Sequence, residues 1–193
     1  FTFQSLEMAE QFSVHIWTSI TVGFVVAFPF VVWEFWKFIS PGLYDKERKG
    51  AFAFIVISSF LFFIGVLFGY YLVTPLSVNF LGNYSVSDIV ERNITIGSYI
   101  SLVRSSSLAS GLIFELPIVM YFLTKMGLIT PDFLKKYRKH ALVLVLILAA
   151  IITPPDVISQ IIVGIPIMIL YEVSIIISKI VVKRELKKEK ENA

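Results

Sequence analysis

A carboxylate in the middle of an apolar run is the residue whose type and place most clearly suggest chemistry. Glu115 lies within residues 97–126, a stretch apolar and long enough to form a membrane helix. At about 1.5 Å per residue, it lies about 15 Å from Lys125, where the run ends, and so near the middle of a bilayer. Such a group suits a proton relay or a substrate site. A structural carboxylate that only helps helices associate is the alternative.

The helical face that carries Glu115 is small and polar. Helical steps back from it reach Gly111, Leu108, Arg104 and Ser101. We expect this face to look into protein or water and, with Ser101 and Gly111, to line an intramembrane pocket. Pro117 lacks the N–H that would complete the helix, so a kink is expected beside Glu115.

Catalytic chemistry finds little support elsewhere in the chain. His15 and His140 lie near opposite ends of their apolar runs, and Asp156 has no second intramembrane aspartate beside it. The sequence has no cysteine, Walker loop, dinucleotide fingerprint or metal-ligand cluster. We therefore expect no enzyme activity, catalytic residue, metal or other cofactor. A proton-coupled transporter of small solutes that uses Glu115 stays open, although the spans show no internal repeat.

Composition places these residues in a membrane protein. Of 193 residues, 56% are hydrophobic and 16% charged, and the mean hydropathy is +0.81. These values exclude an ordinary soluble domain and predict an all-α, polytopic helical bundle in the lipid bilayer. The sequence begins with Phe1 and carries no charged leader with a cleavage site, which suggests a missing N-terminus and not a signal peptide.

Apolar runs and breaks predict a single transmembrane domain, residues 1–193, with five spans. An external segment, residues 1–12, and a cytoplasmic tail, residues 181–193, flank them. The predicted spans are residues 13–38, 51–74, 98–125, 138–153 and 157–180. Gly65 and Gly69 form a GxxxG step that lets another helix approach closely. Thr130 and Pro131 predict a capped helix start.

The fourth and fifth runs are short, so a re-entrant hairpin is an alternative to two spans through a thinned bilayer. The charges favour two spans. Lys and Arg gather in the loop around Lys46, in residues 125–139 and in the tail, whereas the opposite loops hold Arg92 alone. This asymmetry predicts an external N-terminus and a cytoplasmic C-terminus.

Three stretches carry a family resemblance: FWKFISPGLYDKERK at residues 35–49, IFELPIV at residues 113–119 and TPPDVISQ at residues 153–160. In this order and on these sides of the membrane, they resemble the TatC family, the core subunit of the twin-arginine protein translocase. The resemblance implies a six-helix fold with a concave pocket of bent helices. It further implies that this chain holds helices two to six and lacks the first helix and its leader.

The resemblance also implies a function in a bacterial-type inner membrane. The protein would bind the twin-arginine signal peptide of folded precursors and assemble with the single-span subunits TatA and TatB. Export would be driven by the proton-motive force, in a larger complex that includes further copies of this chain. Nothing points to a nucleic-acid partner.

Site residues follow from the same resemblance. Glu47 matches the signal-binding glutamate, with Phe38, Pro41 and Tyr44 shaping the loop around it, and Glu115 matches a buried pocket glutamate. An exposed carboxylate suits the planar fork of arginine. The turn with Pro154, Pro155 and Asp156, together with Gln160, would dock a partner helix. Asp156 as a plain helix cap, and Glu47 as a helix-start acid, are the alternatives.

Overall fold

The computed structural model describes residues 8–39, 51–85, 95–154 and 156–192, and these are almost entirely helical. The all-α prediction is confirmed. The described helical stretches long and apolar enough to cross a membrane are Glu10–Phe38, Phe52–Asn83, Ile96–Lys125 and Val157–Lys187. The fourth run of the sequence forms a helix of only 15 residues, Arg138–Ile152. The count of five spans therefore stays a prediction.

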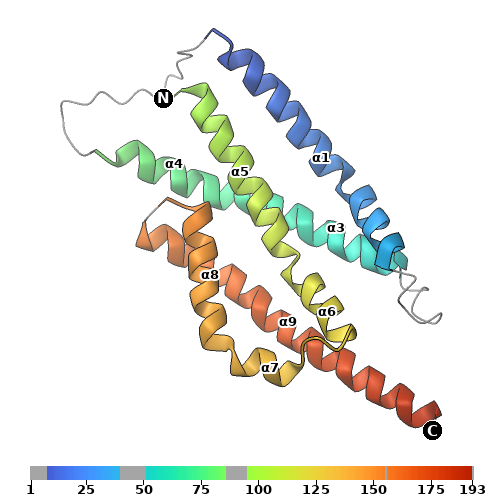
Figure 1. Cartoon of the computed structure of the whole chain (residues 1–193). Coiled ribbons are helices and arrows are strands. Elements are labelled where there is room, and N and C mark those ends of the chain that lie inside the picture. The colour runs from blue at the N-terminus through green and yellow to red at the C-terminus, as the bar shows by residue number, and fades with distance from the viewer. Residues whose placement is uncertain (1–7, 40–50, 86–94, 155, 193) are drawn as a thin grey trace. The chain divides into compact units, whose positions relative to one another are not determined.

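Contacts divide the chain into two compact units, Phe1–Gly111 and Leu112–Ala193. The first unit contains α1 (Glu10–Ile39), α3 (Ala51–Phe68), the π-helix η2 (Gly69–Val73), α4 (Thr74–Asn83) and most of α5 (Ile96–Phe114). Figure 1 shows α3, η2 and α4 as one nearly continuous line. The helix thus runs nine residues past position 74, into the stretch expected to leave the membrane.

The core of the first unit lies where α1 packs on α3. Phe28 and Val32 of α1 are buried with Ile55 and Phe62 of α3, and Leu108 of α5 packs against them. The rings of Phe28 and Phe62 stack with their centroids 3.5 Å apart and an interplanar angle of 7°. In lipid, burying apolar side chains between helices gives no hydrophobic gain, because the acyl chains are equally apolar. Aromatic stacking and close packing therefore stabilise this helix pair.

The second unit contains α6 (Leu116–Lys125), α7 (Pro131–Lys136), α8 (Arg138–Ile152) and α9 (Val157–Asn192). α6, α7 and α8 all pack along α9. Leu134, Tyr171 and Ile175 form the buried cluster of this unit. At 36 residues, α9 is about 54 Å long, well beyond the roughly 30 Å of a bilayer core.

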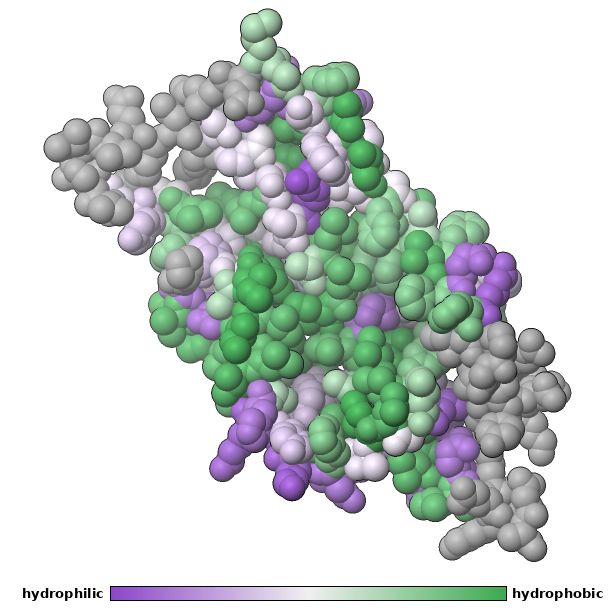
Figure 2. Space-filling model, viewed as in Figure 1, coloured by the Kyte–Doolittle hydropathy of each residue, from purple (hydrophilic) through white to green (hydrophobic). Residues whose placement is uncertain are grey.

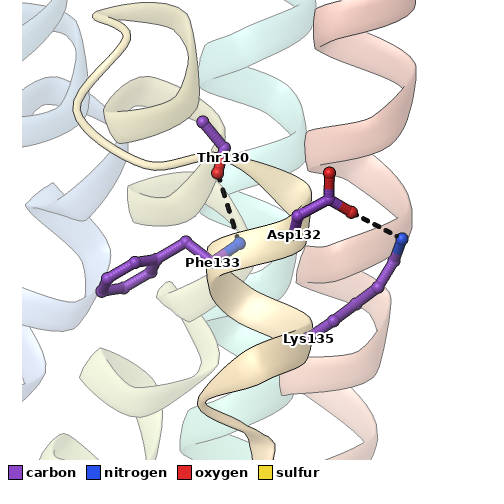
Figure 3. Close-up of polar contacts among 4 residues, drawn as sticks. All are labelled: Thr130, Asp132, Phe133 and Lys135. Carbon is purple, nitrogen blue, oxygen red and sulfur yellow. Dashed lines mark hydrogen bonds and ion pairs between the residues drawn. The ribbon is translucent and has the colours of Figure 1, made fainter.

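The predicted helix start at Thr130 is confirmed. The Thr130 hydroxyl accepts a hydrogen bond of 3.2 Å from the backbone N–H of Phe133, and Pro131 opens α7 (Figure 3). The backbone N–H groups of the first turn of a helix have no carbonyl acceptor within that helix, and the Thr130 side chain supplies one.

Large apolar side chains remain exposed on both units. Phe30 and Trp33 of α1 are exposed in the first unit, as are Ile151 of α8 and Ile165 of α9 in the second. A soluble protein rarely leaves such continuous apolar surface in water. Together with the long apolar helices, this surface is that of a multi-pass membrane protein.

Candidate functional site

The helix that carries Glu115 is interrupted at that residue, as predicted. α5 ends at Phe114 and α6 begins at Leu116, and Glu115 between them has a ψ of −6°. Its N–H donates to the carbonyl of Leu112 at 3.1 Å, a tighter turn than the α-helix makes. Pro117, which is buried, supplies the cause because it has no N–H to continue the ladder.

The carboxyl group of Glu115 is partly enclosed, and its Oε1 is buried. The backbone beside it is also polar, since Pro117 cannot pair with the carbonyl one turn earlier. α6 then packs along α9, where the hydroxyl of Thr124 donates to that of Ser178 at 2.9 Å. A carboxyl at a helix break between apolar segments is equipped to exchange a proton or to accept a polar group.

The predicted pocket face of α5 belongs to the first unit, where it packs against protein. A Cβ built on Gly111 would lie 2.8 Å from the Phe62 ring, so α3 approaches closely there. The guanidinium of Arg104 lies over Trp17 of α1, 5.0 Å from the ring centroid. The expectation that this face looks into protein is confirmed for these residues. The shared pocket of Ser101, Gly111 and Glu115 stays a prediction, because Glu115 belongs to the second unit.

Ser101 lies nearer the start of α5. It lines a hollow of about 500 Å³ with Ser98 and Ser105 of α5 and with Leu81 and Gly82 of α4. Its carbonyl accepts a hydrogen bond of 2.7 Å from the Ser105 hydroxyl. The small side chains here leave open space between the two helices.

The GxxxG prediction is confirmed at Gly69. A Cβ built on this residue would lie 2.5 Å from the carbonyl oxygen of Ser106 and 2.6 Å from the Cα of Ser107, so η2 and α5 meet backbone to backbone. Beside this contact, the buried hydroxyls of Thr74 and Ser106 are 2.8 Å apart and hydrogen-bonded. The Thr74 hydroxyl also donates to the carbonyl of Gly69 at 2.9 Å, and the same carbonyl accepts the backbone N–H of Thr74.

Of the four residues expected to bind a signal peptide, the structure describes one. Phe38 lies near the end of α1 with 84% of its surface exposed. Pro41, Tyr44 and Glu47 lie outside the described residues. Lys37 forms an ion pair of 2.7 Å with Glu34 on the same exposed part of α1.

At the last turn, Asp156 caps α9. Its carboxylate accepts hydrogen bonds from the backbone N–H groups of Ser159 at 2.8 Å and Ile158 at 3.4 Å. Hydrogen bonds from the side chain and backbone of Ser159 hold the pKa of Asp156 below its ordinary value of 3.8. The capping alternative is confirmed, and it leaves a docking role untested. Pro155 lies outside the described residues, and Pro154 precedes the cap.

Gln160 makes a contact within the chain. Its side-chain amide donates to the carbonyl of Leu146 at 2.7 Å and so joins α9 to α8. A polar side chain that was expected to hold a partner helix therefore also stabilises the α8–α9 hairpin.

Sequence reasoning missed two long-range polar contacts. Glu10 of α1 accepts a hydrogen bond of 2.8 Å from the N–H of Gly97 at the start of α5. Arg138 at the start of α8 donates to the carboxylate of Glu172 of α9 at 2.7 Å. For the first contact, the signal in the sequence was a single acid near the end of an apolar run. For the second, it was a base and an acid in or near two neighbouring runs. Neither signal identifies the partner before the helix pairing is known.

Among the described residues, no group of three or more His, Cys, Asp or Glu side chains is placed to hold a metal ion.

The comparisons with known proteins agree with each other. The family model described as Sec-independent protein translocase protein (TatC) matches residues 1–166. The TatC protein of Blattabacterium sp. subsp. Periplaneta americana is 46% identical over 182 residues, which cover 94% of this chain and 68% of that protein. The TatC protein of Helicobacter pylori is 42% identical over 180 residues, which cover 93% of this chain and 71% of that protein.

Solved structures give the same result. A crystal structure of the twin arginine translocase receptor TatC has a TM-score of 0.74 and 36% identity, and the match covers 93% of this chain and 79% of that one. A second crystal structure, of the same receptor in DDM, has a TM-score of 0.76 and 37% identity. The chain therefore belongs to the TatC family, the Sec-independent protein translocase proteins, and is a non-enzymatic subunit of the twin-arginine translocase.

Proposed function

We propose that this chain is the receptor subunit that binds the twin-arginine signal peptide of folded precursor proteins. The observation that carries the proposal is the match, over 93% of the chain, to a solved structure named the twin arginine translocase receptor. Three sequence motifs in the expected order, from the first loop, the middle helix and the last turn, also support it.

Recognition in this proposal rests on Glu47. Two consecutive arginines present planar guanidinium forks, and a carboxylate accepts such a fork through two parallel hydrogen bonds. Phe38 is exposed at the end of α1, near in sequence to that loop, and would cover the apolar part of the signal peptide. Pro41 and Tyr44 would shape the loop between them.

Assembly with TatA and TatB would use the α8–α9 hairpin. An apolar groove of about 480 Å³ runs along these helices and is lined by residues including Val145, Gly164 and Met168. Gly164 leaves room for close helix approach, which is how helices associate in lipid. Asp156 and Gln160 lie at the end of the hairpin where α9 begins, so the partner helix would meet a polar group there.

Glu115 would act after recognition. A carboxyl beside a helix break is suited to a step that moves cargo with the proton-motive force, for which a group able to gain and lose a proton is needed. The small-solute transporter that uses the same residue is not favoured, because the family is a protein translocase.

The location in this proposal is a bacterial-type inner membrane, with the C-terminus in the cytoplasm. The Lys and Arg residues of the α7 region and of the α9 tail support this orientation. The five spans, the external segment and the cytoplasmic tail belong to the same proposal.

Substitution of Glu47 tests the receptor role. Glu47→Ala and Glu47→Gln should abolish crosslinking of a twin-arginine signal peptide while the protein still inserts and folds. Glu47→Asp should keep part of the crosslinking, and Glu47→Lys should be worse than Glu47→Ala because it repels the arginines. Unchanged crosslinking in Glu47→Ala would exclude this site.

A further inference from the structure

The segment from Thr130 to His140 gathers basic and aromatic side chains on α7 and the start of α8. Its four basic residues are Lys135, Lys136, Arg138 and Lys139, and Asp132 is its single acid, so its net charge is +3 with His140 neutral. The function proposed above uses these residues only for the orientation of the chain in the membrane and assigns them no binding role. The density of charge indicates an anionic partner, and the surrounding contacts indicate which kind.

One face of α7 is fixed to α9. Leu134 is only 3% exposed and packs with Tyr171 and Ile175. The hydroxyl of Tyr171 donates to the Leu134 carbonyl at 2.8 Å. These contacts determine which side chains of α7 point outward.

The outward side chains include two neighbouring aromatic rings. Phe133 is 48% exposed and Tyr137 is 38% exposed, and their ring centroids are 4.5 Å apart. The segment lies between the end of the apolar α6 and the start of the apolar α8, where a membrane helix reaches the headgroups. In Figure 2, hydrophilic side chains gather at the lower edge of the view, over α7, below the apolar surface of α8. Aromatic side chains prefer this boundary because one end is apolar and the other is wet.

Two of the four basic side chains already have acidic partners. Lys135 pairs with Asp132 at 2.9 Å (Figure 3), and Arg138 pairs with Glu172 at 2.7 Å. In the part of the chain that the structure describes, Lys136 and Lys139 have no acidic partner, and both are exposed. The Lys136 ammonium lies 6.0 Å from the centroid of the Tyr137 ring.

We propose that the segment from Thr130 to His140, which comprises α7 and the start of α8, is a binding site for the headgroups of anionic phospholipids. Lys136 and Lys139 contact the phosphates, and Phe133 and Tyr137 rest at the boundary of the acyl chains. A soluble phosphate would need the lysines but gains nothing from the exposed rings. An acidic protein segment would compete with lipid for a surface that adjoins two membrane helices. A polybasic segment next to a membrane helix binds anionic lipid through its charge, and the exposed rings add apolar contact.

Lipid binding to the full chain, measured by native mass spectrometry in detergent, tests the proposal. Phosphatidylglycerol should bind, and phosphatidylcholine at the same concentration should bind far less. The double variant Lys136→Gln/Lys139→Gln should bind phosphatidylglycerol about 25-fold more weakly, since each lysine near an anionic surface contributes about fivefold. Lys136→Arg/Lys139→Arg, which keeps both charges, should retain binding.

A matched control distinguishes lipid binding at this site from a general effect of the positive charge of the chain. Lys179→Gln/Lys183→Gln removes the same charge from exposed positions of α9 and should leave most of the binding intact. An equal loss in both double variants would overturn the proposal, as would unchanged binding in Lys136→Gln/Lys139→Gln. Displacement of phosphatidylglycerol by millimolar inorganic phosphate would also overturn it, because the site would then hold a soluble anion.

Depth measurement gives a second readout. The chain contains no cysteine, so Phe133→Cys can carry a single bimane label. In phosphatidylglycerol vesicles, lipids brominated close to the headgroup should quench this label more strongly than lipids brominated near the acyl-chain end. A label quenched only by a water-soluble quencher would show that α7 stands away from the membrane and would contradict the proposal.

Discussion

Replacement of Gly69 by alanine should separate two helices that meet backbone to backbone. The new methyl group would lie 2.5 Å from the Ser106 carbonyl oxygen and 2.6 Å from the Ser107 Cα. Both are backbone atoms and cannot rotate away. To reach ordinary contact at about 3.5 Å, α5 would have to move by about 1 Å.

The displacement has two consequences that add. Inserting a methyl group into a packed interface typically costs about 1–3 kcal/mol. The same movement would stretch the bond between Thr74 and Ser106 from 2.8 Å to beyond hydrogen-bonding range, and such a bond between membrane helices contributes about 0.6–1.7 kcal/mol. We expect Gly69→Ala to lower the free energy of unfolding by about 2–5 kcal/mol more than the same substitution at a helical glycine without this contact.

Gly23 of α1 provides that control, since a Cβ there would meet nothing within 4 Å. Gly23→Ala gains the same helix propensity as Gly69→Ala, because both replace a helical glycine by alanine. The difference in unfolding free energy between the two variants therefore measures the packing cost alone. Gly111→Ala should fall between them, because it would push against side chains, the Phe62 ring and Val66, and not against backbone. Reversible unfolding in SDS mixed micelles, followed by circular dichroism, measures the series. A difference below about 0.5 kcal/mol between Gly69→Ala and Gly23→Ala would refute the close approach.

Three further predictions concern the proposed sites. Glu115→Ala should leave folding intact and reduce export of folded cargo while signal-peptide crosslinking at Glu47 persists; joint loss of binding and export would contradict the separation of roles. Asp156→Asn should keep the cap of α9. The part of the free energy of unfolding that depends on the protonation of Asp156 should disappear, so the stability of the variant should change less with pH at low pH. The carboxylate stabilises the fold above its unfolded-state pKa, near 3.8, and that stability is lost as the pH falls through the lowered folded-state pKa. For topology, an impermeant thiol reagent on intact cells should label Asn83→Cys and not Lys136→Cys, and the reverse pattern would invert the proposed orientation.

Local features were predictable from the sequence because their causes lie within a few residues. Thr130 and Pro131 form a helix start by their own backbone preferences, and the proline at 117 lacks the N–H that would continue the helix past Glu115. Pro29 and Pro166 lie inside the continuous helices α1 and α9, so a proline alone does not fix where a helix breaks. The close approach at Gly69 was expected from the absence of a side chain, although the sequence did not reveal that the partner would be the serines of α5.

The remaining features depend on which helices become neighbours. In the sequence, Gln160 is a polar side chain in an apolar run. Only the fold shows that its amide donates to the Leu146 carbonyl of α8. Arg104 had no predicted partner, and the structure places it over Trp17, more than 80 residues earlier in the chain. The π-helix η2 was not predicted from the sequence, and the structure shows its Gly69 against the backbone of α5, a contact that depends on which helices are neighbours.

Equilibrium binding of a synthetic twin-arginine signal peptide to this chain in nanodiscs tests the central claim most directly. The comparison is a peptide in which both arginines are replaced by lysines, because it keeps the charge and removes the planar fork. The receptor account predicts saturable binding of the arginine peptide, much weaker binding of the lysine peptide and loss of the difference in Glu47→Gln. Equal binding of the two peptides, or no binding of the arginine peptide to well-folded protein, would contradict it.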